Sequence, residues 1–275
     1  MSKIGLKGAS GLGDTIYAYP IVNYYAKKHK TVYYMTDYPE IYQSIPNVKC
    51  HPHQKLNYFT LKDGSKQPVD IRFTYTPRKY TPGTSQFTDS CISAGITKKI
   101  DLTIPWKIQN NPLVEKVKRL NKHKKKVCVL SAPYEPFGRE DEWGKILRID
   151  PVFMQNIVDA YKDEVFFIQV GNKYTLKKIR GVDIDLVNKT TVSDLFDLVK
   201  ICCFGLSQIG NLLPLCECLG KRNMIIFTRK AIESENRFIA AITPEKTVHY
   251  KKQNISVMDN DIEKGIIRFN GFINS

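Results

Sequence analysis

Short apolar segments alternate with longer segments of helical periodicity from the first residues of the chain. Residues 4–6 and 31–35 are rich in strand-forming side chains, and between them residues 15–29 follow a helical pattern that contains Pro20. Residues 39–44 predict a further short helix, whereas 50–90 show no regular period. Strands and helices in alternation are typical of a parallel sheet covered by helices, so the first part of the chain predicts an α/β domain.

The second half of the chain repeats this alternation. The apolar run 165–170 is nearly continuous, as a strand buried on both faces requires. The expected strands are 127–130, 165–170, 184–187, 202–206 and 224–228, and the expected helices are 151–161, 192–201, 212–219 and 259–269. Two successive βα runs predict the α/β class, with two Rossmann-like, doubly wound domains that face a central cleft.

The break between the two runs sets the predicted domain boundaries. Asn110, Asn111 and Pro112 interrupt the pattern, and residues 116–126 then carry seven Lys or Arg side chains. We therefore predict a first domain over 1–110, a basic linker over 111–126 and a second domain over 127–258. We expect residues 259–275 to form a C-terminal helix that packs back on the first domain.

Composition narrows the functional classes. The 275 residues hold 42 Lys+Arg against 27 Asp+Glu, a net charge of +15, which favours nucleic acid, an acidic membrane face or a phosphate-rich substrate as partner. A biased genome would produce the same excess. The seven cysteines lack a C-x-x-C pair, which predicts buried free thiols and no metal site. The chain shows neither a signal peptide nor an apolar run long enough to span a membrane, so we expect a cytoplasmic protein.

The loop after the first strand carries the first candidate chemistry. Gly8 to Thr15 spells G-x-x-x-x-G-D-T, but Asp14 stands where a P-loop needs its phosphate-binding Lys. The dinucleotide fingerprint also fails, because Ile16 replaces its third glycine. What remains is a tight turn, with Gly11 and Gly13 allowing close approach of a ligand, that presents one carboxylate. Two interpretations stay open for Asp14: a helix N-cap or a catalytic group.

The second candidate loop lies between the last two apolar strands. Residues 205–211 are small and polar ahead of an apolar helix, so Ser207, Gln208, Gly210 and Asn211 are candidates for phosphate binding, with helix capping as the alternative. The start of the preceding helix is similar. Thr191 is a plausible cap there, while Lys189 and Thr190 can meet phosphate or ribose oxygens.

Two blocks of sequence resemble one enzyme family. The block G-L-G-D-T-I-Y-A-Y-P, residues 11–20, is similar to the N-terminal G-D-x-x-x-x-x-P block of the ADP-heptose:lipopolysaccharide heptosyltransferases, which are GT-B glycosyltransferases. Residues 186–200 and 205–221 resemble the same family's G-x-T-S-L-x-E-L-A-x-L-I helix and G-N-D-S-G-P-M-H loop and helix. Together the blocks cover about a sixth of the chain.

The resemblance implies roles for these residues. Asp14 would be the general base on the acceptor hydroxyl, and residues 207–211 would hold the pyrophosphate of a UDP- or ADP-linked sugar, the co-substrate, without a metal or other cofactor. Arg139 would supply a cation, with Lys7 as second candidate. The sequence departs from the family pattern at Ile209 and Pro214, which replace the Asp and His of the loop, and at Glu142, which replaces a Lys. An ADP-heptose donor is therefore not carried over.

The acceptor stays open between two classes. Charge in both halves, together with the nucleic-acid candidates Arg72, Tyr75, Arg78 and Lys79, favours a hydroxymethylated pyrimidine in bacteriophage DNA, modified in the host cytoplasm. A lipopolysaccharide core or other surface glycan is the alternative, since its phosphates and the anionic membrane also suit a basic protein. A third interpretation, a binding module without catalysis, is disfavoured by the intact Gly13-Asp14 pair.

Overall fold

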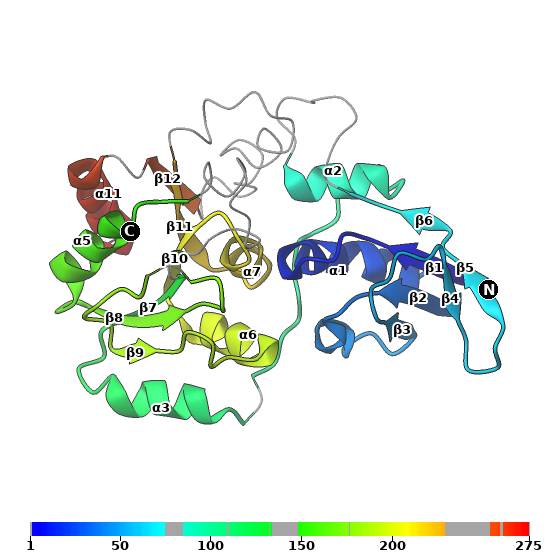
Figure 1. The fold of residues 1–275 in the computed structure, drawn as a ribbon, viewed down its shortest axis with the longest axis horizontal. Coiled ribbons are helices and arrows are strands. Elements are labelled where there is room, and N and C mark those ends of the chain that lie inside the picture. Colours follow the sequence, from blue (N-terminus) through cyan, green and yellow to red (C-terminus); the bar gives the residue numbers. More distant parts are fainter. Residues whose placement is uncertain are drawn as a thin grey trace. The chain divides into compact units, whose positions relative to one another are not determined.

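The computed structural model describes residues 2–74, 85–108, 110–131, 133, 148–175, 177–228, 254–258 (backbone) and 261–274. The chain divides into two compact units, which we call the N-terminal unit, residues 1–105, and the C-terminal unit, residues 106–275 (Figure 1). The boundary thus falls five residues before the predicted one. Each unit is described by itself.

The N-terminal unit is built on a parallel sheet of four strands in the order β3-β2-β1-β6 (Figure 1). Helix α1 (Leu12–Ala26) follows β1 and packs on β2, and Pro20 lies within this helix. The strands are β1 (Lys3–Lys7), β2 (Thr31–Met35), β3 (Val48–His51) and β6 (Ile71–Arg72), with a short 3-10 helix, η1 (Pro39–Tyr42), between β2 and β3. The central position of β1 places the start of α1 at the middle of this sheet's carboxyl edge.

Part of the stretch without a regular period forms a hairpin on the other face of this sheet. Strands β4 (Tyr58–Thr60) and β5 (Lys66–Pro68) pair antiparallel, and the wholly buried Phe59 packs with Tyr33 and Met35 of β2. Helix α2 (Gln86–Ser93) begins at Ser85, whose side chain caps it, and contacts α1. The irregular pattern therefore reflects short strands whose partners lie nearby in sequence.

The C-terminal unit contains a six-stranded, wholly parallel sheet in the order β12-β11-β10-β7-β8-β9. Counted from β7, this is the Rossmann order 3-2-1-4-5-6 read from its other end. The strands are β7 (Lys126–Ser131), β8 (Val165–Val170), β9 (Ile184–Asp185), β10 (Phe204–Gln208), β11 (Arg222–Phe227) and β12 (Asn254–Met258). The prediction of a doubly wound parallel sheet is confirmed.

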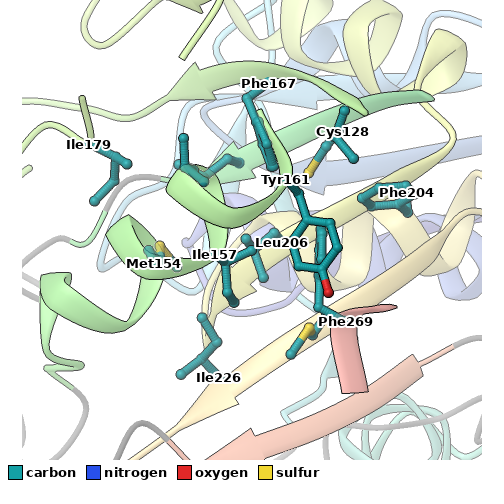
Figure 2. Close-up of a cluster of buried hydrophobic side chains, with 14 of the residues drawn as sticks. Cys128, Met154, Ile157, Tyr161, Phe167, Ile179, Phe204, Leu206, Ile226 and Phe269 are labelled. Atoms are coloured by element: carbon teal, nitrogen blue, oxygen red, sulfur yellow. The ribbon is translucent and has the colours of Figure 1, made fainter. Parts of the chain in front are cut away.

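Among the described residues, two pairs of helices cover this sheet. Helices α5 (Pro151–Tyr161) and α11 (Ile262–Asn274) pack together on one face, where Phe269 meets the rings of Tyr161, Phe167 and Phe204 (Figure 2). Helices α6 (Val192–Ile201) and α7 (Leu212–Cys218) belong to the other face. The C-terminal helix is thus present as predicted, but its buried side chains, Phe269, Phe272 and Ile273, complete the core of its own unit.

The predicted basic linker is wrong for most of its length. Residues Pro112–Leu120 form helix α3, which buries Val114 and Val117 and packs on α6. Asn111 caps this helix and donates to Asp194 and Asp197 of α6, both at 2.9 Å. Trp106 also donates to Asp197, at 2.7 Å. The charges dominate the composition of this segment, but the two valines, three residues apart, fix it as an amphipathic helix.

Candidate active site

Both candidate loops lie where a parallel sheet changes direction. In the N-terminal unit β1 lies between β2 and β6, and its carboxyl end leads into Gly8 and on to α1. In the C-terminal unit the change falls between β7 and β10, and the carboxyl end of β10 leads into Gly210 and Asn211. Ligands of open α/β sheets bind outside the carboxyl ends of the strands at such switch points. Topology therefore supports both loops independently of any motif.

Asp14 occupies the third position of α1 rather than its N-cap. The N-cap is Gly11, which has an extended backbone and no side chain to cap with. The Gly11 amide donates to the Asp14 carboxylate, and a Cβ built on Gly11 would lie 2.8 Å from Asp14 Oδ2. The interpretation of Asp14 as an N-cap is therefore wrong, and its carboxylate folds back over the helix start.

Burial makes this carboxyl a weak acid. Removal from water raises the pKa of Asp14 from 3.8 to about 6, although the hydrogen bond from the Gly11 amide acts in the opposite direction. A carboxyl with a pKa close to the working pH is well matched to take a proton from a substrate hydroxyl and to release it afterwards. The geometry thus supports an acid–base function for Asp14 beside its effect on the helix dipole.

Close packing explains why glycine occupies position 8. A Cβ there would lie 2.8 Å from the Phe73 ring and 3.1 Å from Tyr34 Oη. Neither Gly8 nor Gly11 has a positive φ, in contrast to Gly64, Gly95, Gly181 and Gly220. Space for neighbouring side chains therefore explains the glycines at positions 8 and 11, and the close approach of a ligand to Gly11 and Gly13 stays a prediction.

Lys7 is engaged in holding a neighbouring loop. Its ammonium donates to the carbonyls of Gln54 and Leu56, at 2.5 and 3.1 Å. Burial and the nearby Arg72 guanidinium lower the pKa of Lys7. His53 also contacts the candidate loop, with Nε2 3.3 Å from the Gly8 carbonyl oxygen. Lys7 therefore fixes residues 53–56 beside Gly8 and is a poor candidate for the phosphate-binding cation.

The second candidate loop is shorter than expected. Ser207 and Gln208 belong to β10, are almost completely buried, and lie opposite Ile225 and Ile226 of β11. Asn223 donates to Ser207 Oγ at 3.0 Å inside the sheet. The polar side chains suggested a loop, but pairing with the next strand extends β10 over them. Gly210 and the exposed Asn211 remain at the surface as candidate contacts for a ligand.

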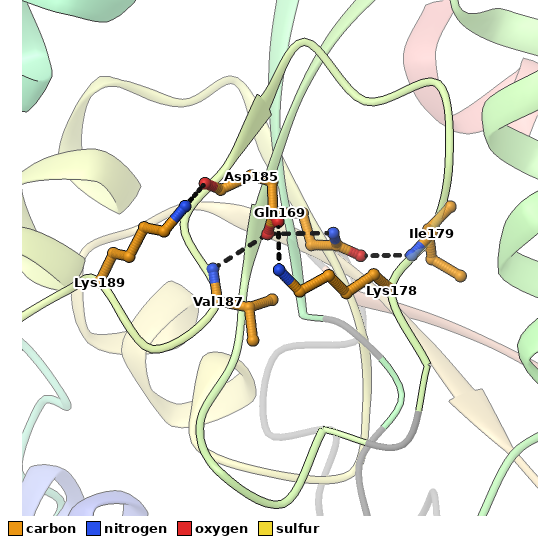
Figure 3. A network of polar contacts seen from close by, with 6 residues as sticks. All are labelled: Gln169, Lys178, Ile179, Asp185, Val187 and Lys189. Atoms are coloured by element: carbon orange, nitrogen blue, oxygen red, sulfur yellow. Dashed lines mark hydrogen bonds and ion pairs between the residues drawn. The ribbon is translucent and has the colours of Figure 1, made fainter.

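A polar network shapes the segment that leads to Lys189 and Thr190, the other predicted phosphate-binding residues. The wholly buried Gln169, at the end of β8, donates to Asp185 Oδ1 at 3.3 Å and accepts from the Ile179 amide at 2.7 Å (Figure 3). Lys178 pairs with Asp185 at 2.6 Å. Sequence patterns do not reveal this network, because the single Gln within an apolar strand is its only signal.

Lys189 and Thr190 lie between this network and helix α6. Lys189 is exposed, with Nζ 3.5 Å from the Asp185 carbonyl oxygen (Figure 3). Asn188 before it adopts a positive φ of 60°. Thr191 forms a full capping box with Asp194, which confirms it as the predicted cap. Lys189 and Thr190 are thus held at the amino end of a capped helix, on the same edge of the sheet as Gly210.

The remaining predicted residues are not brought together by the described structure. Arg72 ends β6 beside Lys7 of β1 and is exposed. Tyr75, Arg78, Lys79 and Arg139 lie outside the described residues. Within the described ranges, no three His, Cys, Asp or Glu side chains group to hold a metal ion. Over the same ranges, no helix is long and apolar enough to cross a membrane.

Comparisons with known proteins address the fold. The chain matches no protein-family model, and no curated protein matches it either. Among solved structures, it is similar to a glycosyl transferase family 9 protein from Veillonella parvula, with a TM-score of 0.61 and 12% identity over 98% of this chain and 89% of that one. The fold is GT-B.

Two Escherichia coli enzymes support the same assignment. The ADP-heptose lipopolysaccharide heptosyltransferase II gives a TM-score of 0.60 at 11% identity, covering 98% of both chains. Heptosyltransferase WaaC with ADP gives 0.53 at 9% identity, covering 97% of this chain and 96% of that one. The resemblance found in the two sequence blocks is thereby confirmed at the level of the GT-B fold.

Proposed function

We propose that this protein is a glycosyltransferase that moves a sugar from a nucleotide-diphosphate sugar to an acceptor hydroxyl. The observation that carries the proposal is a partly buried carboxyl, Asp14, with a pKa of about 6 at the switch point of the N-terminal unit. The solved structures with the same GT-B fold, which are named as glycosyltransferases, support the reaction class.

The reaction assigns one task to each unit. Asp14 removes the proton of the acceptor hydroxyl as its oxygen attacks the anomeric carbon, and the bond from that carbon to the nucleotide diphosphate breaks. Lys189, Thr190, Gly210 and Asn211 would contact the donor, and Lys189 would balance the charge that develops on the leaving diphosphate. A protein cation in this place makes the reaction metal-independent, so excess EDTA should leave the rate unchanged.

For the acceptor we favour a sugar hydroxyl of a phosphorylated surface glycan. The two Escherichia coli enzymes named above are heptosyltransferases, and one is named for lipopolysaccharide. The net charge of +15 suits a phosphorylated acceptor. Hydroxymethylated DNA in a phage-infected host is the second candidate, which the same charge and the exposed Arg72 favour. The cytoplasmic location remains a prediction.

One experiment tests the reaction and the acceptor together. The protein is incubated with UDP- and ADP-linked sugars and with either dephosphorylated or native lipopolysaccharide core, or with duplex DNA containing hydroxymethylcytosine. Release of the nucleotide diphosphate and the mass of the acceptor are measured. We expect sugar transfer to native core. Transfer to DNA alone would show that the acceptor is DNA and not the glycan. The absence of transfer from every donor would refute the proposed glycosyltransferase activity.

A further inference from the structure

Two buried hydroxyl groups lie close to the candidate base without a hydrogen-bond partner among the described residues. They are Thr15 Oγ1, in the first turn of α1, and Tyr34 Oη, from β2. Both side chains are 0% exposed. Next to them, Tyr42 Oη donates to the Thr15 carbonyl oxygen at 2.8 Å. An unpaired buried hydroxyl costs free energy, so two at one place call for a functional explanation.

The packing of its ring orients the Tyr34 hydroxyl toward the loop that carries Asp14. Its ring lies 5.0 Å from that of Tyr42 and stacks on Phe73 at 6.3 Å, which leaves little freedom to rotate. Its oxygen lies 3.1 Å from the position that a Cβ on Gly8 would take. Glycine at position 8 therefore admits the hydroxyl end of Tyr34 to the inner side of the loop.

The Asp14 carboxylate also influences the ionisation of this hydroxyl. Burial raises the pKa of Tyr34, and the negative charge of Asp14 adds to the increase, while the nearby hydroxyls of Tyr42 and Thr15 lower it without reaching hydrogen-bond geometry. A protonated tyrosine is a hydrogen-bond donor at every pH at which Asp14 titrates. The Gly11 amide supplies one hydrogen bond to Asp14, and a carboxylate can accept several.

We propose that Tyr34 is a positioning residue for Asp14, with its hydroxyl donating a hydrogen bond to the carboxylate once that carboxylate is ionised. The interpretation of Asp14 as a base rests on the proposed function, but the hydrogen bond itself does not. With one oxygen held by Gly11 and the other by Tyr34, the carboxylate keeps one orientation toward an acceptor hydroxyl. Such fixed orientation is what proton transfer in a substrate complex requires.

The other titratable groups around Tyr34 and Asp14 do not complicate the interpretation of a Tyr34→Phe substitution. Tyr38 also senses the Asp14 charge, and Tyr42 and Cys50 face Tyr34. Burial raises the pKa of all three, so they are neutral over the range in which Asp14 titrates. Glu40 faces Tyr38 and Cys50. Removing the Tyr34 hydroxyl therefore changes one donor and no charge.

The test is the titration of Asp14 in the full-length protein, followed by the carboxyl 13C shift of labelled aspartate and assigned with Asp14→Asn. We expect Tyr34→Phe to raise the midpoint by roughly half a unit to one unit, because a hydrogen bond to the charged form is lost. If the protein transfers sugar, the pH profile of kcat/KM should shift with the pKa of Asp14. At a pH well below the Asp14 midpoint, kcat/KM of Tyr34→Phe should then be about three- to tenfold lower than that of the wild type. The titration needs no substrate, so it remains decisive if the proposed function fails.

The matched control is Tyr25→Phe in the same unit, which removes a hydroxyl bonded to the Ala94 carbonyl oxygen at 2.6 Å. It should lower the melting temperature and leave the Asp14 midpoint in place. Tyr34→Phe should melt at the wild-type temperature or above, because it removes an unpaired group. An unchanged Asp14 midpoint in folded Tyr34→Phe would overturn the proposal, and so would a lower melting temperature without a shift.

Discussion

The two switch points differ in the charge that they offer a ligand. In the N-terminal unit the loop after β1 ends in Asp14, a carboxyl in the first turn of α1. In the C-terminal unit, the first turn of α7, which follows β10, carries no acidic residue, and Asp194 of α6 is held in a capping box. A carboxylate repels phosphate and accepts protons, whereas neutral amides and Lys189 attract phosphate. The same topology thus supports two different tasks.

Among the substitutions that test this comparison of the two loops, Gly8→Ala should reduce sugar transfer most. The new methyl group would meet Phe73 at 2.8 Å and Tyr34 at 3.1 Å, so the Asp14 loop must shift. We expect transfer to fall about 100-fold, because a displacement of one ångström misaligns the base. Stability should fall by ~1–3 kcal/mol. Rates of sugar transfer and urea denaturation measure the two effects.

Gly271→Ala provides the control, because its Cβ meets open space in helix α11. It should leave transfer unchanged and add about 0.5–1 kcal/mol of stability. Wild-type transfer in Gly8→Ala would show that the position of this loop does not matter for the reaction.

A smaller and more selective effect is expected from Lys189→Ala in the C-terminal unit. Loss of one charged hydrogen bond to a diphosphate should weaken binding of the nucleotide about tenfold. Isothermal titration calorimetry with UDP and ADP measures this, and Lys200→Ala, at the other end of α6, is the control. Equal affinities for both variants would remove Lys189 from the donor site.

The smallest expected effect is a change of stability with pH. Its sign is opposite for Asp14 in the N-terminal unit and Asp185 in the C-terminal unit. The folded pKa of Asp14, about 6, lies above its ordinary 3.8, so its contribution to stability is present below pH 4 and is lost as the pH rises to 6. For Asp185 burial is the largest influence and raises the pKa, but hydrogen bonds from Lys178 and the Val187 amide outweigh it and lower the pKa. Its contribution is therefore lost as the pH falls.

Melting temperatures distinguish these signs when Asp14→Asn is measured at about pH 4.5 and 7.5 and Asp185→Asn at about pH 2.5 and 4.5, where each group titrates. As the pH rises across its own range, Asp14→Asn should gain on the wild type by roughly 2–4 °C, and Asp185→Asn should lose on it. The same sign for both variants would contradict the assigned environments.

Local signals in the sequence were sufficient for the elements that they control. Strand β8 and helices α5 and α6 have the predicted bounds, because an unbroken apolar run, Pro151 and Thr191 mark them. The position of Asp14 was predicted as part of the site, but its place in the helix was not, since Gly11 gives no capping signal. A glycine N-cap has no capping side chain, so the sequence pattern does not mark where this helix begins.

Long-range contacts decided what the sequence left open. Ser207 became part of a strand because Asn223 and β11 pair with it. Gly8 is required by Phe73, which lies 65 residues further along the chain, and Gln169 of β8 donates to Asp185 of the neighbouring strand β9. Periodicity reports the neighbours of a residue in sequence, and these partners are neighbours only in space.

The central claim is that Asp14 is the base of a sugar transfer whose donor binds elsewhere. It is tested most directly by measuring, for Asp14→Asn, both transfer from the best nucleotide sugar of the panel and the dissociation constant of that sugar. The account predicts a loss of transfer of about 10²–10⁴-fold with the dissociation constant unchanged. Transfer at the wild-type rate would contradict it.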